Sequence, residues 1–451
     1  MGTLLSALGF WKRPARMADL LHPRFVVPGL FWFVGFFPMI FYALFTLETD
    51  AYGGYREEQS VYALIYLILC LTMFWVGFGI PLGGDFLRKM FGRLPAAKDL
   101  TRLRGASVVL ALGTLVLLFA GMGSSLWTAD SGAWLVPVEF MDYAVKYVVL
   151  PSTILAAIFY GLAWPAKGEP RTPGLYAAAA VVLAATSVPL AATFSRASGI
   201  MPILMVLGYA LRHKRIPWRV TTLAILFVLY GAQVGISGRG IYGHYAGVYP
   251  YLQHMFDSSN LSGEELGGKA MSMDSLTPLS VVMSANQRNA DLMAISPLEW
   301  IWFQVPIPHV TGLGGTFTFD PTLFLGGYGV SGYTPTMFGD TFGHLGWWGC
   351  LAFIYMGMLY RILENSVEQR PTDGEGLDLA LLCLPIGYFA FMQGAFNTFR
   401  AWNSTFTFGI AGAVVGVYIF NKLTQRQAQI WSYSPESESS AKSASVKNAI
   451  A

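Results

Sequence analysis

The sequence contains little charge and almost no cysteine. Only 12% of its 451 residues are charged, about half the share of a typical soluble domain, and 54% are apolar, with a mean hydropathy of +0.49. These values exclude a soluble enzyme, a disordered chain and a coiled coil, and the long apolar runs argue against an outer-membrane barrel. All three cysteines lie in apolar runs, so we expect neither a disulfide framework nor a zinc site.

The motifs of nucleotide and metal chemistry are also missing. There is no P-loop, no GxGxxG after a strand, no HExxH and no CxxC. There is also no DxD pair that could bind a nucleotide sugar through a metal ion. The net charge of +3 indicates no nucleic-acid partner. The apolar runs contain almost no ionisable residue away from their ends, which argues against an ion-coupled pump. We therefore expect no cofactor and no bound metal.

Long apolar runs are what the sequence does contain. Ten of them are apolar enough to predict membrane-spanning helices, at about 27–47, 60–80, 105–125, 144–164, 174–194, 197–211, 220–236, 337–361, 377–397 and 403–421. The predicted fold is therefore an all-α, polytopic integral membrane protein with about ten transmembrane helices. We find no internal repeat of the kind that many secondary transporters carry.

The distribution of positive charge predicts the orientation of these helices. With the amino terminus in the cytoplasm, 22 of the 29 Lys and Arg residues fall in inner segments and six in outer ones, in agreement with the positive-inside rule. Both termini are then cytoplasmic. The predicted organisation is an inner segment (1–26), helices one to seven (27–236), a large outer loop (237–336), helices eight to ten (337–421) and a disordered cytoplasmic tail (422–451).

Polar residues gather at the predicted outer ends of the helices, which places a candidate active site at the outer face. Arg196 lies 16 residues before Arg212, about 24 Å along a helix, whereas the hydrocarbon core is about 30 Å thick. Arg196 is therefore expected either to face a wet cavity or a ligand, or to snorkel to the headgroups.

Two further groups of polar residues are candidates for binding. The segment 235–240 (GISGRG) carries Arg239 and leads to Tyr242 and His244, which fits either anion and sugar binding or a plain exit turn. Arg288 and Arg400 are either ligands or surface cations. Loop residues such as Glu299 have no constraint that we can name.

Asp340 and His344 form the most definite pair. Their i, i+4 spacing places them on one helix face, and Gly339, Gly343 and Gly346 form a small-residue stripe beside them that allows close helix packing. The pair is either an acid–base pair or an Asp favoured by the helix dipole together with an interfacial His.

These features together resemble a known family. The dipeptide Ser195-Arg196 between two central helices, the large outer loop after an Arg-containing glycine-rich exit, and the segment 339–346 (GDTFGHLG) resemble the Wzy-type O-antigen and exopolysaccharide polymerases over about 170–421. The related O-antigen ligases also carry outer-face arginines and a loop histidine, a part that His244 or His309 would play, so a ligase remains an alternative.

The resemblance implies a GT-C-like glycosyltransferase of the bacterial inner membrane that joins oligosaccharide repeat units carried on undecaprenyl pyrophosphate at the periplasmic face. It implies no metal or nucleotide, and a chain-length regulator and a flippase as partners. The expected substrate-binding residues are Arg196, Arg239, Arg288, Arg400 and Tyr242, and the expected catalytic residues are Asp340, His344 and His244. A lipid-linked oligosaccharide flippase and a non-catalytic envelope subunit are the competing interpretations.

Overall fold

The structure is a computed structural model. It describes residues 22–36, 59–81, 100–127, 135, 149, 152–153, 156–157, 159–160, 172–193, 247–256, 279–280, 282–284, 296–304, 336–368, 379–395, 398–407, 409–411 and 422. These residues form helices and no strand. Three helices, Val61–Gly79, Arg104–Leu126 and Thr336–Asn365, are long and apolar enough to cross a membrane. The chain is thus an all-α membrane protein; the predicted count of ten spans is not confirmed, and the spans at 197–211 and 220–236 lie outside the described residues.

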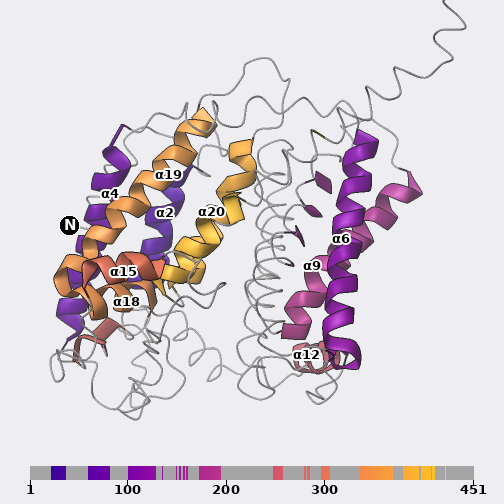
Figure 1. Ribbon diagram of the computed structural model, residues 1–451, viewed down its shortest axis with the longest axis horizontal. Coiled ribbons are helices and arrows are strands. Elements are labelled where there is room, and N and C mark those ends of the chain that lie inside the picture. The colour runs from indigo at the N-terminus through magenta and orange to yellow at the C-terminus, as the bar shows by residue number, and fades with distance from the viewer. Residues whose placement is uncertain are drawn as a thin grey trace, which may run out of the picture.

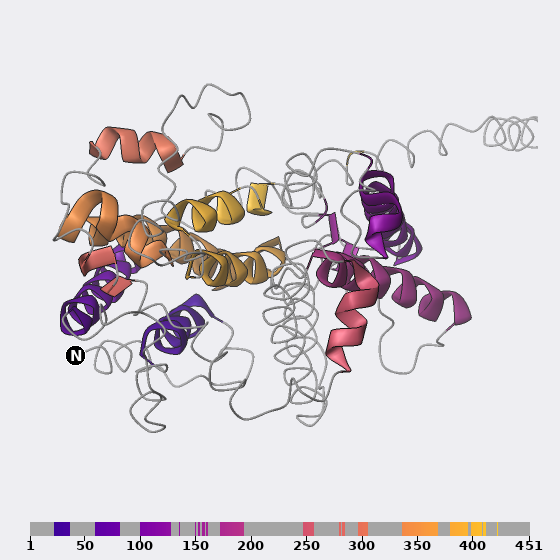
Figure 2. The same cartoon turned by 90° about the horizontal axis from the view of Figure 1, so that it is seen from below.

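The described helices pack in two groups (Figures 1 and 2). The first group shares one large aromatic core and contains α2 (Pro23–Phe31), α4 (Ser60–Gly79), α18 (Thr336–Leu345), α19 (Ala352–Glu368) and α20 (Leu379–Ala395). The second group contains α6 (Leu100–Met122), α9 (Pro173–Thr193) and α12 (Val248–Met255). Segments that are distant in sequence are therefore neighbours in the first group.

The first helix begins earlier than the apolar run predicts. Pro23 occupies the first turn of α2, and the carbonyl of His22 accepts hydrogen bonds from the amides of Phe25 and Val26. Proline is favoured at this position because its ring presets the helical φ and no amide is lost from the helix. The predicted span begins at about 27 because it follows hydropathy alone. After Phe31 the helix passes into a π-helical turn, η2 (Trp32–Phe36).

Helices α4 and α19 approach each other closely through glycines. A Cβ at Gly77 would overlap the carbonyl oxygen of Ile354, and a Cβ at Gly357 would overlap the carbonyl oxygen of Phe74. These atoms belong to backbone and cannot rotate away. Close packing through glycines therefore joins α4 and α19.

Gly77→Ala is expected to destabilise the protein by about 1–3 kcal/mol, the cost typical of an overpacked core. The added methyl group forces α4 away from the backbone of α19. Gly79→Ala is the matched control, since it lies on the same helix with nothing within 4 Å of its Cβ position and alanine favours the helix. Thermal unfolding in detergent should lower the midpoint for Gly77→Ala alone; equal midpoints for the two variants would contradict the close approach.

The predicted span at 337–361 is a broken helix. Helix α18 ends at Leu345, Gly346 has a φ of 58°, and a 3-10 segment, η9 (Gly346–Leu351), precedes α19. The left-handed region is open to glycine at little cost, so Gly346 turns the chain; its Cβ position has nothing within 4 Å. The expectation that Gly346 packs in a stripe was therefore wrong.

A buried carboxylate joins the first helix to α19. The Glu364 side chain is fully buried and makes an ion pair with Arg24, a second one with Arg361 at 3.2 Å, and a contact of 3.7 Å between its Oε1 and the Nδ1 of His22. The guanidinium of Arg361 also lies 5.4 Å from the ring centre of Phe78 on α4. This cluster ties α2, α4 and α19 together near the carboxyl-terminal end of α19.

The elements of the predicted outer loop gather at the other end. Helix α12 and a further helix, α15 (Pro297–Gln304), both come from the segment 237–336. In Figure 1 both lie in the lower half of the molecule, α15 in the first group with α18 and α12 at the foot of α6 and α9 in the second group. The amide of Tyr249 in α12 donates to the carbonyl of Trp127, just after α6, at 3.0 Å. Asp340 and His344 on α18 therefore lie in the same half of the molecule as the two loop helices.

Candidate functional site

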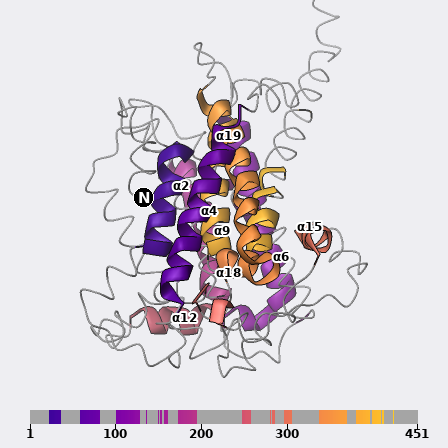
Figure 3. The same ribbon diagram turned by 90° about the vertical axis from the view of Figure 1, so that its left-hand side faces the viewer.

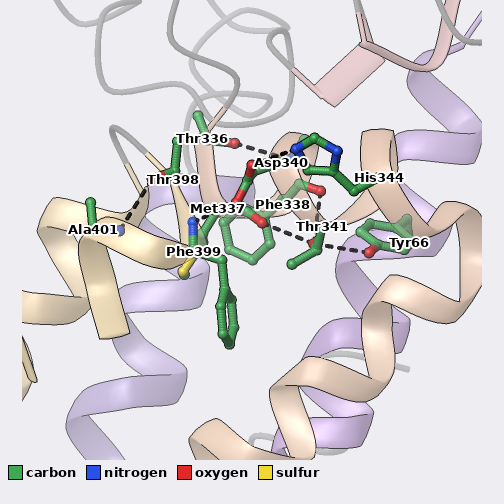
Figure 4. A network of polar contacts seen from close by, with 11 residues as sticks. Tyr66, Thr336, Met337, Phe338, Asp340, Thr341, His344, Thr398, Phe399 and Ala401 are labelled. Carbon is green, nitrogen blue, oxygen red and sulfur yellow. Dashed lines mark hydrogen bonds and ion pairs between the residues drawn. The ribbon is translucent and has the colours of Figure 1, made fainter. Parts of the chain in front are cut away.

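Asp340 and His344 form a nearly buried carboxylate–imidazole pair. Their side chains are each 9% exposed, and the Nε2 of His344 lies 3.4 Å from the Oδ1 of Asp340. Figure 4 shows the two side chains next to each other on α18. The helical spacing brings the pair together as predicted.

The second oxygen of Asp340 binds a distant part of the chain. The amide of Phe399 donates to Oδ2 of Asp340 at 3.1 Å (Figure 4). Phe399 is the first residue of a helical segment, 399–407, in which the hydroxyl of Thr398 accepts from the amide of Ala401 at 3.1 Å. The amides at a helix start have no partner within the helix, so Asp340 and Thr398 each satisfy one. Both carboxylate oxygens of Asp340 therefore have fixed partners.

Buried contacts also hold the neighbouring faces of α18. The hydroxyl groups of Tyr66 and Thr341 lie 3.0 Å apart, and the Thr341 hydroxyl donates to the carbonyl of Met337 at 2.9 Å. A Cβ at Gly349 would lie 2.6 Å from the hydroxyl oxygen of Tyr66, so η9 also packs closely here. The rings of Phe338 and Phe353 stack with centres 5.5 Å apart. These contacts fix the rotation of α18 and thereby the direction of the Asp340–His344 pair.

Helix α15 packs on the same helical segment that meets Asp340. The rings of Trp300 and Phe399 have centres 5.3 Å apart, and the side-chain amide of Asn403 donates to the carbonyl of Gln304 at 2.9 Å. Two buried atoms of α15, the Nε1 of Trp300 and the Oε1 of Gln304, have no hydrogen-bond partner in the part of the chain that the structure describes. A buried donor and acceptor of this kind call for a polar ligand or water.

Of the eight predicted site residues, three are described. Asp340 and His344 meet. Arg400 directly follows Phe399, is half-buried, and lies in the first turn of the segment 399–407. The predicted spans at about 377–397 and 403–421 leave Arg400 between them, whereas in the structure a helical segment already begins at Phe399, after the capping Thr398. Five predicted site residues lie outside the described residues: Arg196, Arg239, Tyr242, His244 and Arg288.

Sequence reasoning missed the residues that support the pair. The Phe399 amide leaves no trace in the sequence, because any residue except proline carries one. The start of α15 was detectable: Ser296 and Glu299 form a capping box around Pro297, with the Ser296 amide donating to Oε2 of Glu299 at 2.8 Å and the Glu299 amide donating to the Ser296 hydroxyl at 3.2 Å. Glu299 therefore has a defined place in a helix, contrary to our expectation.

The arrangement suits proton transfer. A carboxylate that is hydrogen-bonded on one side and faces an imidazole on the other orients the ring and stabilises its protonated form. Because both oxygens of Asp340 are engaged, His344 is the better candidate for the group that takes a proton, with Asp340 as its support. No family model matches this chain, and no curated protein or solved structure matches it.

Proposed function

We propose that this protein is a glycosyltransferase that polymerises oligosaccharide repeat units carried on undecaprenyl pyrophosphate, at the periplasmic face of the bacterial inner membrane. The observation that carries the proposal is the nearly buried Asp340–His344 pair, next to the helix start that bears Arg400 and on which α15 packs. The sequence motifs support it by resemblance, and the lack of a nucleotide motif fits a donor that arrives already activated on a lipid.

In the proposed reaction His344 is the general base. It takes the proton of an acceptor hydroxyl, whose oxygen forms a bond to the anomeric carbon of the donor sugar. The bond from that carbon to the pyrophosphate oxygen breaks, and undecaprenyl pyrophosphate leaves with the electron pair. Asp340 orients His344 and stabilises its protonated form. The unpaired Trp300 Nε1 and Gln304 Oε1 suit sugar hydroxyls, which both donate and accept hydrogen bonds.

The pyrophosphate needs cations because its charge grows as the bond breaks. Arginine is suited to this because its planar fork matches two phosphate oxygens. We assign this role to Arg196, Arg239 and Arg400, with Arg288 and Tyr242 as further substrate contacts and His244 as a second candidate base. Arg400 is supported by its position beside Phe399; the other assignments rest on the sequence.

The proposal requires a GT-C-like arrangement of about ten spans with both termini in the cytoplasm. Reporter fusions after Gly267 and after Lys422 test this orientation. We expect a cytoplasmic reporter to be inactive after Gly267 and active after Lys422, because 22 of the 29 Lys and Arg residues fall on the inner side in this orientation. Cytoplasmic activity of the Gly267 fusion would contradict it.

Deleting the gene in its host should stop polymer growth and leave single lipid-linked repeat units. The reason is that synthesis of each repeat unit precedes the step that we assign to this protein. Extraction of lipid-linked glycans, with gel analysis of the polysaccharide, measures both products, and a plasmid copy of the wild-type gene is the control.

The other outcomes of this experiment distinguish the competing functions. Full-length polymer that fails to reach its final carrier would favour a ligase. Lipid-linked repeat units that accumulate on the inner face would favour a flippase. Unchanged polysaccharide would favour a structural subunit.

A further inference from the structure

Helix α15 carries an exposed apolar stripe. Leu298, Ile301 and Trp302 are 79%, 56% and 55% exposed. Their i, i+3, i+4 spacing places them on one face of the helix. Trp300 and Gln304, which are buried, lie on the opposite face. The helix thus has one apolar side against the protein and another turned outward.

The direction of α15 differs from that of the spanning helices. In Figure 1 its axis is nearly horizontal, whereas α4 and α19 run from top to bottom. In Figure 3 it is seen nearly end-on at the edge of the molecule, while α4 and α19 run along the picture. If α4 and α19 cross the bilayer, α15 lies parallel to its surface. It packs on the segment 399–407 and lies at about the level of α18, toward the lower end of α19 in Figure 1, which corresponds to the depth of an interface.

The chemistry of the outward side also fits an interface. Tryptophan is enriched where headgroups meet acyl chains, and a short helix with an apolar stripe lies flat there. At the start of the helix, hydrogen bonds from the side chain and the backbone amide of Ser296 lower the pKa of Glu299, which keeps this flanking carboxylate ionised. Val61, Tyr62 and Ile65 on α4 are also exposed apolar residues, as expected of a surface that meets lipid.

We propose that α15 is an interfacial helix, with Leu298, Ile301 and Trp302 inserted in the outer leaflet beside the Asp340–His344 pair. The inserted helix connects the membrane surface to that pair. Its Trp300 packs on Phe399, and the Phe399 amide binds Asp340. The leaflet follows from the orientation proposed above, whereas the insertion itself does not depend on glycosyl transfer.

Spin labels on the full-length protein in phosphatidylcholine–phosphatidylglycerol vesicles test the insertion without any activity assay. Ile301→Cys and Trp302→Cys are labelled one at a time in a background with Cys70, Cys350 and Cys383 replaced by Ala, and Ser296→Cys is the control at the polar start of the helix. Collisions with oxygen, which concentrates in lipid, are compared with collisions with a water-soluble nickel chelate. We expect labels at 301 and 302 to collide more often with oxygen than with the nickel chelate, and a label at 296 to collide more often with the nickel chelate.

Two results would overturn the proposal. Nickel access at 301 and 302 equal to that at 296 means that the helix lies in water. Shielding of 301 and 302 from both reagents means that protein covers the stripe. As a second variant, Ile301→Asp should expose a label at 302 to nickel, because a charge is costly in the apolar layer, whereas Glu299→Gln should leave the label protected. If the depth profile is as expected and polymer synthesis is normal without the gene, the proposed function fails and this inference stands.

Discussion

Asp340→Asn is expected to lower the rate of polymer formation by about 10²–10⁴-fold, the usual contribution of general acid–base catalysis, while the protein still accumulates. Asparagine has the shape of aspartate and its carbonyl oxygen can still accept from the Phe399 amide. It carries no charge, however, and cannot stabilise the protonated form of His344. His344→Asn is expected to have an effect of the same size, because it removes the proposed base.

The losses of rate caused by the two substitutions should not be additive. When two residues act as one catalytic unit, removing either one already abolishes the contribution of both. The double variant is therefore expected to be about as slow as the slower single variant. The measurement is the initial rate of chain extension from purified lipid-linked repeat units, at equal amounts of protein in the membrane. Additive losses would indicate that Asp340 and His344 act separately.

Thr398→Ala is the control that separates catalysis from structure. It removes the hydrogen bond between the Ala401 amide and the Thr398 hydroxyl at the start of the segment 399–407, but leaves the Asp340–His344 pair intact. Loss of such a cap costs about 1 kcal/mol, so we expect lower stability and a nearly normal rate per folded molecule. If Asp340→Asn behaves in the same way as Thr398→Ala, Asp340 is a helix cap and not part of a catalytic site.

Glu364→Met is expected to destabilise the protein by about 3–5 kcal/mol, the cost of removing one partner of a buried ion pair. Glu364 is fully buried and contacts Arg24, Arg361 and His22. Without it, the Arg24 side chain, which is 19% exposed, retains its charge in a mostly buried place. Arg24→Met should have a similar effect, since it leaves the carboxylate of Glu364 buried with fewer partners.

The double variant Arg24→Met/Glu364→Met should recover much of this loss. Replacing both members of a buried pair with apolar residues of similar size is often neutral. Arg361→Met is the control: its side chain is 31% exposed, so water screens the pair that it loses and the cost is expected to stay near or below about 1 kcal/mol. Unfolding midpoints in detergent measure all four variants. A double variant as unstable as the sum of the singles would contradict a direct Arg24–Glu364 interaction.

The sequence by itself was sufficient for the local features of this protein. Apolar runs predicted the helices α4, α6, α9 and α20 within a few residues. Of these, α4 and α6 are long and apolar enough to cross a membrane. The i, i+4 spacing brought Asp340 and His344 to one face because helical periodicity acts over four residues and needs no other part of the chain.

Only the tertiary structure decided what these local features meet. Hydropathy predicted one span at 337–361 but does not reveal the turn at Gly346. The hydropathy of a glycine depends only on its residue type, and not on whether its φ is positive, as it is at Gly346. Arg24 and Arg361 were interpreted as orientation signals alone, yet both contact Glu364, and Arg24 lies 340 residues away from it in the sequence. The second partner of Asp340 is a backbone amide 59 residues distant. Such pairs depend on how helices pack, and packing is set by the shapes of many side chains at once, which no short sequence pattern contains.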